Sequence, residues 1–134
     1  MESAVLRSRT AVLVVEDDPL ILMNAVDIVF DAGFEALEAT NADEAIRILA
    51  TRDDVRVVFT DMNMPGSMDG LKLACAVRRR WPPVQFIVAS GHIKVTESDL
   101  PLGSYFFSKP YLPSQITKAL REIYARDRLL KPAA

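Results

Sequence analysis

Reactive side chains follow four of the apolar runs in this chain, at the point where each run ends. They are Glu16, Asp17 and Asp18 after the run 11–15, Asp61 after 55–60, Ser90 after 84–89, and Lys109 after 105–108. Carboxylates that lie together bind divalent cations, and a carboxylate can also attack phosphorus. The set therefore indicates phosphoryl chemistry at a metal site, provided that the fold brings the four ends together.

The acidic residues predict the metal. Glu16, Asp17 and Asp61 would repel one another if they met, and burial would raise that cost. A divalent cation removes the conflict, and oxygen ligands alone favour Mg²⁺, with Mn²⁺ as a substitute, over zinc. The backbone carbonyl of Asn63 is a further candidate ligand, because it lies in the turn that follows Asp61. The alternative for residues 16–18 is a solvated cap before a helix, where acidic residues are common.

Asp61 is the candidate nucleophile, since a carboxylate that attacks phosphorus becomes an acyl phosphate. Phosphoryl transfer depends on positioning and on the neutralisation of charge. Lys109 would neutralise one phosphoryl oxygen, and the Ser90 hydroxyl would donate to another. The ordinary alternatives are a surface lysine and a turn serine before Gly91. His92 is the only histidine, and no metal-ligand spacing surrounds it, so catalysis by His92 alone is not expected.

The apolar runs predict the strands that position these groups. They are continuous and rich in Val and Phe, as in strands that are buried on both faces of a parallel sheet. A fifth strand is predicted over 34–38. Parallel strands bring their carboxyl ends to one edge, where open sheets of this kind bind ligands. We therefore expect the reactive residues to meet at that edge.

Helices are predicted over 19–30, 42–51, 69–81 and 113–128. Pro19 suits a first helical turn, and Asn41 with Glu44 has capping-box spacing. Only about one further turn fits within 91–104, since Pro101 and Gly103 interrupt it. Alternating strands and helices with short connections predict right-handed crossovers and helices on both faces. The expected fold is α/β: a doubly wound (βα)5 unit with five parallel strands and a short or irregular fourth helix.

Composition excludes several classes of protein. The formal net charge of −2 provides no basic field for nucleic acid. No apolar run approaches the roughly 20 residues of a membrane span. The single cysteine, Cys75, excludes an internal disulfide framework and fits a reducing cytosol. It lies in an apolar helical pattern, so a buried thiol is expected. A cytoplasmic protein without nucleic-acid or membrane partners is predicted.

Four motifs occur in order along the chain: VLVVEDD, VVFTDMNMPGSMDG, FIVASGH and FFSKP. Together they resemble the receiver domain of two-component response regulators, over residues 11–124. The resemblance implies a CheY-like, flavodoxin-like sheet with strand order 2-1-3-4-5. It also implies that the chain takes a phosphoryl group from a kinase's phosphohistidine onto its own aspartate, with Mg²⁺.

The resemblance gives each strand end a role. Asp61 resembles the phospho-accepting aspartate. Glu16 and Asp17 resemble the acidic pair that binds the metal, and the carbonyl of Asn63 resembles its third protein ligand. Lys109 resembles the invariant lysine. Glu16 is longer than the aspartate often found at its position, which would change its metal contact to one through water.

Ser90 and Phe106 resemble the family's switch residues, in which the aromatic ring changes rotamer when the hydroxyl moves toward the phosphoryl group. A plain core aromatic is the alternative for Phe106. Asn63 and His92 lie two residues beyond Asp61 and Ser90. Both would border the path of attacking water and tune dephosphorylation.

The expected protein is a single-domain response regulator, with an extension over 1–10, a receiver domain over 11–128 and a tail over 129–134. It would catalyse its own phosphorylation and dephosphorylation without acting on external substrates. Its partners would be a sensor histidine kinase or a histidine phosphotransfer protein, and its output would be protein–protein contact or phosphoryl relay. In the family, the stretch that corresponds to 91–104 forms the fourth helix, which partners recognise. Because this stretch is helix-poor here, the resemblance does not define the switching surface or decide whether the chain forms a homodimer.

Two other functions fit parts of the pattern. A metal-dependent phosphatase that forms an aspartyl phosphate usually has a second aspartate two residues after its nucleophile, as general acid. Asn63 occupies that place here. A phosphorylation-independent binding module would have a degenerate site, whereas every expected group is present. Comparing the binding of a partner to wild type and to Asp61→Ala would separate such a module from a response regulator.

Overall fold

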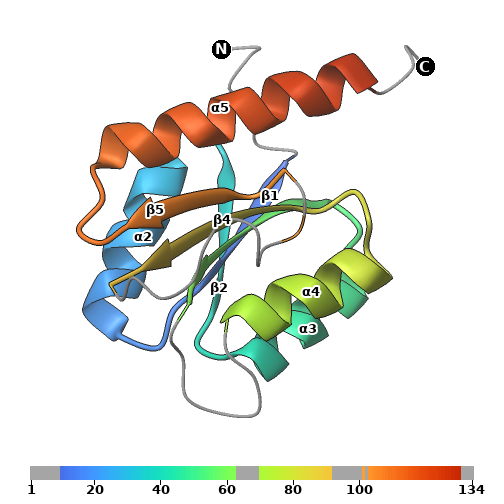
Figure 1. Ribbon diagram of the computed structural model, residues 1–134, viewed down its shortest axis with the longest axis horizontal. Helices are drawn as coiled ribbons and strands as arrows, with labels where there is room; N and C mark the ends of the chain where they lie inside the picture. Colours follow the sequence, from blue (N-terminus) through green and yellow to red (C-terminus); the bar gives the residue numbers. More distant parts are fainter. Residues whose placement is uncertain (1–9, 63–69, 92–100, 102, 131–134) are drawn as a thin grey trace.

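Five strands form one parallel sheet in the order β2-β1-β3-β4-β5 (Figure 1). The computed structural model describes residues 10–62, 70–91, 101 and 103–130. The order and the parallel pairing confirm the predicted fold. The strands are β1(Ala11–Val15), β2(Glu35–Ala39), β3(Val55–Asp61), β4(Gln85–Ser90) and β5(Tyr105–Ser108).

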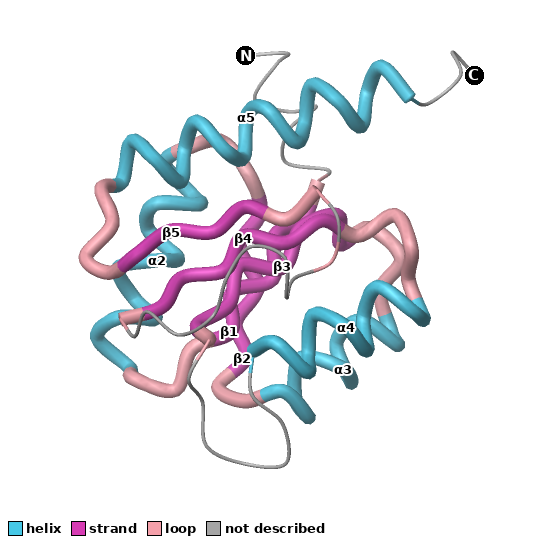
Figure 2. The backbone as a smooth tube through the Cα atoms, viewed as in Figure 1, coloured by secondary structure: helices cyan, strands magenta, loops and turns pink. Residues whose placement is uncertain are grey.

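Helices cover both faces of the sheet (Figure 2). They are α2(Pro19–Asp31), α3(Ala42–Thr51), α4(Gly70–Arg80) and α5(Pro113–Leu130). In β1, Val12 and Val14 pack with α2 and α5, whereas Leu13 and Val15 pack with α3 and α4. Every residue of β1 is buried. This two-sided burial explains why the run 11–15 is continuously apolar rather than alternating.

Local side-chain contacts fix the helix starts. Asp18 caps α2, and its Oδ1 accepts from the N–H of Leu20 at 2.9 Å. Asn41 caps α3 by accepting from the N–H of Glu44 at 2.8 Å. The Glu44 side chain accepts in return from the N–H of Thr40 at 3.0 Å. The predicted capping box is therefore present, with its return bond one residue earlier than the usual pattern.

Two expectations are changed by the structure. The prediction of a buried Cys75 is wrong, because Cys75 is exposed. The buried face of α4 is formed instead by Leu73, Ala74 and Val77. The strands predicted over 34–38 and 84–89 each lie one residue later, at Glu35–Ala39 and Gln85–Ser90.

Some predicted features lie outside the described residues. They include Asn63, Asp69, His92 and most of the stretch predicted as the fourth helix. Within the part of the chain that is described, none of the helices has the length and apolar character needed to cross a membrane.

Candidate functional site

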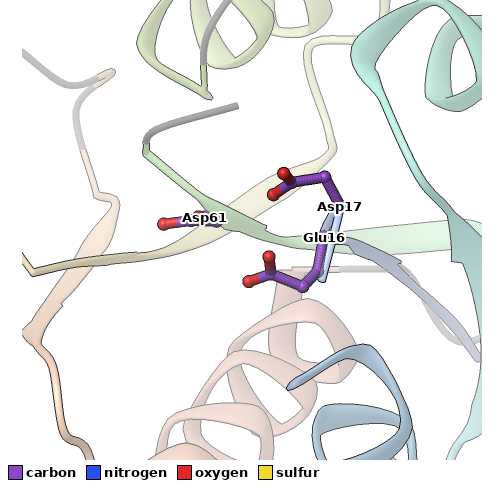
Figure 3. A group of neighbouring side chains, drawn as sticks. All are labelled: Glu16, Asp17 and Asp61. Carbon is purple, nitrogen blue, oxygen red and sulfur yellow. The ribbon is translucent and has the colours of Figure 1, made fainter. Parts of the chain in front are cut away.

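Three carboxylates meet at the carboxyl edge of the sheet (Figure 3). Glu16 and Asp17 directly follow β1, and Asp61 is the last residue of β3. One oxygen of each lies within 4.8 Å of the other two. Glu16 and Asp61 are buried, whereas Asp17 is exposed. The group is thus set into the sheet edge but reaches solvent through Asp17.

The strand register explains this meeting. Val15 of β1 pairs with Thr60 of β3, so the residue after each lies beside the other. The N–H of Glu16 donates to the carbonyl of Ala39 at 3.0 Å, which continues the β1–β2 ladder by one residue. The Glu16 carboxylate also accepts from the N–H of Asp18 at 3.1 Å. Backbone pairing therefore holds these acids together despite their repulsion.

Lys109 brings a positive charge to the acids. Its Nζ lies 3.1 Å from Asp61 Oδ1 and 3.5 Å from Glu16 Oε1. Among the described residues Asp61 Oδ1 has no hydrogen-bond partner, so the contact is an ion pair rather than an aligned hydrogen bond. The main-chain N–H of Lys109 donates to the Ser90 carbonyl at 2.8 Å. This bond extends the pairing of β4 with β5 and fixes the position of the Lys109 main chain.

The local environment shifts the pKa of two of these groups. Burial raises the pKa of Glu16, and the nearby Asp61 charge adds to this, while the Asp18 N–H and Lys109 oppose it. Burial alone would lower the pKa of Lys109, but its contacts with Asp61 and Glu16 outweigh burial and the pKa is raised. Lys109 is therefore held charged, and the site favours added positive charge.

Ser90 and Phe106 lie where the sequence places them. Ser90 is buried at the end of β4, one residue beyond the Asp61–Ala89 pair. Phe106 pairs with Val88 and packs half-buried against the core beneath α3 and α4. Ser90 thus lies at the edge of the site, and Phe106 lies in the adjacent strand beside Val88.

Sequence reasoning missed one contributor to the site, Tyr111. Tyr111 is half-buried, and its ring packs edge-on against Phe59 with centroids 5.6 Å apart. Burial raises the pKa of its hydroxyl. An aromatic residue two positions after Lys109 was the only signal for it. Asp18 follows the alternative given for residues 16–18, because it caps α2 instead of joining the carboxylate group. Adjacent acids look equivalent in a sequence, and only the backbone path separates them.

The site borders a shallow groove of about 460 Å³ between the start of α2 and the segment after β5. It is lined by Leu20, Ile21, Asn24, Lys109, Pro110 and Tyr111. Leu20 is 75% exposed, and Met23 and Leu112 are exposed as well. Apolar surface of this kind beside a reactive site is typical of a protein-binding region.

The chain is similar to known proteins in both sequence and fold. The sequence matches the response regulator receiver domain family over residues 12–121. It is 34% identical over 104 residues to the nitrogen assimilation regulatory protein NtrX of Azorhizobium caulinodans. It is 32% identical over 121 residues to the hydrogenase transcriptional regulatory protein HoxA of Cupriavidus necator. A solved response regulator receiver domain protein from Clostridium thermocellum matches with a TM-score of 0.83 and 26% identity, over 91% of this chain and 99% of that one.

The curated relatives are much longer than this chain. The NtrX match covers 75% of this chain and 23% of the relative, and the HoxA match covers 85% and 24%. This chain therefore spans about a quarter of the length of these relatives. The similarity concerns one domain of each.

Proposed function

The chain belongs to the response regulator receiver domain family, and we propose that it accepts a phosphoryl group on Asp61. The donor is the phosphohistidine of a sensor histidine kinase or a histidine phosphotransfer protein. The observation that carries the proposal is the ion pair of Lys109 with Asp61, inside a group of three carboxylates. A nucleophile, a counter-charge and a candidate metal site are thus together at one edge.

The transfer exchanges one bond for another. An Asp61 oxygen attacks phosphorus, and the new O–P bond forms as the P–N bond to imidazole breaks. The imidazole nitrogen keeps the electron pair and takes up a proton. Lys109 lies where its ammonium can neutralise a phosphoryl oxygen, and phosphoryl transfer relies on such charge neutralisation. Loss of the phosphoryl group follows when water attacks the acyl phosphate.

The acidic group fits a hard divalent cation. Three carboxylates are matched by the single ammonium of Lys109 among the described side chains that contact them. We propose that Glu16, Asp17 and Asp61 would hold Mg²⁺, with the carbonyl of Asn63 as a further ligand. When bound, the cation neutralises charge on the phosphoryl oxygens. Mn²⁺ has compatible chemistry.

Ser90 and Phe106 form the proposed switch. The buried Ser90 hydroxyl lies at the site edge and would turn toward a phosphoryl oxygen. Phe106 is half-buried in the next strand, and its ring would change rotamer when Ser90 moves. The proposed tuning of dephosphorylation by Asn63 and His92 stays a prediction.

A protein donor suits the surroundings of the site. The groove between α2 and the segment after β5 reaches Lys109, and Leu20, Met23 and Leu112 supply exposed apolar surface around it. This supports docking of a kinase or phosphotransfer protein beside Asp61. A cytoplasmic location stays a prediction. The single-domain organisation and the domain limits 11–128 stay predictions. The absence of a nucleic-acid partner also stays a prediction, and so does the formation of a homodimer.

Phosphotransfer profiling tests the proposal. Histidine kinases and phosphotransfer proteins that carry a labelled phosphoryl group on histidine are mixed with wild type and with Asp61→Asn. The transfer of this phosphoryl group is followed over minutes. We expect at least one donor to label wild type and no donor to label the variant. Equal labelling of the two proteins would contradict the proposal.

The phosphorylation-independent binding module is the second candidate. The partner found by profiling would then bind unphosphorylated wild type, phosphorylated wild type and Asp61→Ala with one affinity. A change of affinity on phosphorylation, absent from Asp61→Ala, would exclude the module.

A further inference from the structure

We propose that Gly70 is a positioning residue for phosphoryl transfer, because its missing side chain lets the first turn of α4 lie directly against the backbone of Asp61. The inference rests on the proposed role of Asp61. Gly70 carries no reactive group, and it acts only through the place that it leaves for the main chain of β3.

The contact is between main-chain atoms on both sides. Gly70 is buried at the first position of α4, and its N–H donates to the Met62 carbonyl at 2.9 Å. A Cβ built on Gly70 would lie 2.2 Å from the carbonyl oxygen of Asp61 and 2.8 Å from the Cα of Met62. Real Cβ atoms essentially never come within 3.0 Å of a heavy atom outside their own residue and its chain neighbours. Any larger residue must therefore displace backbone.

Neither side of the contact yields easily. On the strand side, the N–H of Met62 donates to the Ala89 carbonyl at 2.9 Å, and Asp61 pairs with Ala89 across β3 and β4. On the helix side, Leu73 and Val77 are fully buried in the core beneath α3 and α4. Interiors of this density transmit strain rather than absorb it. A side chain added at Gly70 would therefore also displace the main chain of Asp61.

The size of that displacement matters for the chemistry. An alanine at position 70 requires the separation from the Asp61 carbonyl to open from 2.2 Å to at least 3.0 Å. Misplacement of a reacting group by about 1 Å costs about 10²-fold in rate. The Asp61 carboxylate, now 3.1 Å from Lys109, would move relative to its counter-charge. Gly70 thus helps to set the distance between the Asp61 carboxylate and the Lys109 ammonium, on which the reaction depends.

Gly91 provides a matched control. It lies just after β4, also near the site edge, but a Cβ built there meets no heavy atom within 4 Å. Gly91→Ala therefore makes the same chemical change without the contact. A second control, Leu73→Ala, loosens the buried face of α4 while adding nothing next to Asp61.

The test measures the rate and the extent of phosphorylation by acetyl phosphate with Mg²⁺, using intact mass, on each folded variant. We expect Gly70→Ala to react at least tenfold more slowly than wild type, and Gly91→Ala to react within twofold of it. Leu73→Ala should lose thermal stability but keep the wild-type rate in its folded molecules. Equal slowing of Gly70→Ala and Leu73→Ala would show a merely structural role and overturn the proposal.

A second readout does not depend on phosphorylation. In amide NMR spectra of the unphosphorylated proteins, the Asp61 and Met62 resonances should shift in Gly70→Ala and stay in place in Gly91→Ala. Unshifted resonances in Gly70→Ala would overturn the proposal. If wild type takes no phosphate, the proposed function fails, while this comparison still decides whether Gly70 positions Asp61. If Gly70→Ala does not fold, the wild-type Gly70 amide must shift when Asp61 is phosphorylated, and an unchanged resonance overturns the inference.

Discussion

Lys109 and Asp61 form an ion pair across the carboxyl edge of the sheet, with Nζ 3.1 Å from Oδ1. Lys109 follows β5 and Asp61 ends β3, and β4 lies between these two strands. The lysine reaches across because its main-chain N–H is held by the Ser90 carbonyl at 2.8 Å. The ladder of β4 and β5 therefore determines where the ammonium lies.

Removing this ammonium should slow phosphorylation without removing the acceptor. We expect Lys109→Met to lower the rate of phosphorylation by acetyl phosphate about 10²-fold, the effect of deleting one group that stabilises developing charge. Lys118→Met, at an exposed position on α5, is the matched control and should react as wild type does. Intact mass against time gives both rates. A Lys109→Met rate within twofold of wild type would remove the lysine from the reaction.

Magnesium should stabilise the folded chain through Asp17. A ligand that binds only the folded state adds about 2.7 kcal/mol at a concentration 100 times its Kd. We expect the Tm of wild type to rise with Mg²⁺, and that of Asp17→Asn to stay nearly constant. Asp27→Asn, an exposed change on α2, should follow wild type. A rise of the same size in all three proteins would contradict the proposed metal site.

Asp18 should contribute stability rather than metal binding. Its carboxylate accepts from the N–H groups of Leu20 and Ile21 at 2.9 and 3.3 Å. Replacing such a cap by alanine costs about 1 kcal/mol, so Asp18→Ala should lower the free energy of unfolding by that amount. Its Tm should still rise with Mg²⁺, and Asp18→Asn should restore the stability. Urea titrations measure the first effect, and a variant that no longer responds to Mg²⁺ would place Asp18 in the metal site.

Far from the site, an ion pair should make stability depend on pH. Arg52 Nε donates to Asp54 Oδ1 at 2.9 Å, and this hydrogen bond holds the pKa of Asp54 below its usual value. A depressed carboxyl pKa stabilises the fold above the unfolded value of about 3.9, and the contribution is lost as the pH falls through the folded value. Both side chains are about one-third exposed, so Asp54→Asn should cost no more than about 1 kcal/mol at pH 7.

Urea unfolding of wild type, Asp54→Asn and Asp53→Asn from pH 7 downward measures this dependence. The difference between wild type and Asp54→Asn should shrink below about pH 4, where the unfolded carboxyl begins to protonate. Asp53→Asn removes an exposed neighbouring carboxylate and serves as the control. A difference that grows as the pH falls would show that the Arg52 pair does not depress the Asp54 pKa.

Much of the sheet could be predicted from the sequence because its central strands are buried on both faces. The limits of β1 and β5 were predicted to the residue, and β3 and β4 to within one residue at each end. The edge strand β2 was predicted with the same one-residue offset as β4, although Glu35 and Glu38 are partly or fully exposed and its place depends on pairing with β1. The strand order came from the family resemblance, because apolar runs alone carry no order.

The site was predictable in its residue types but not in its contacts. Glu16, Asp17, Asp61 and Lys109 all come together as expected. Which acid would cap the next helix depended on the turn of the backbone after β1, which a run of three acids does not encode. The tight contact of Gly70 with β3 likewise depends on how α4 approaches the sheet. Packing between elements, rather than local pattern, decides such features.

Phosphorylation of Asp61 itself is the most direct test of the account. Wild type and Asp61→Asn are incubated with acetyl phosphate and Mg²⁺, and their intact masses are recorded over time. Wild type should gain the mass of one phosphoryl group and lose it again when the donor is removed, while Asp61→Asn should gain none. A wild-type chain that takes no phosphate, or an Asp61→Asn chain that takes as much, would contradict the account.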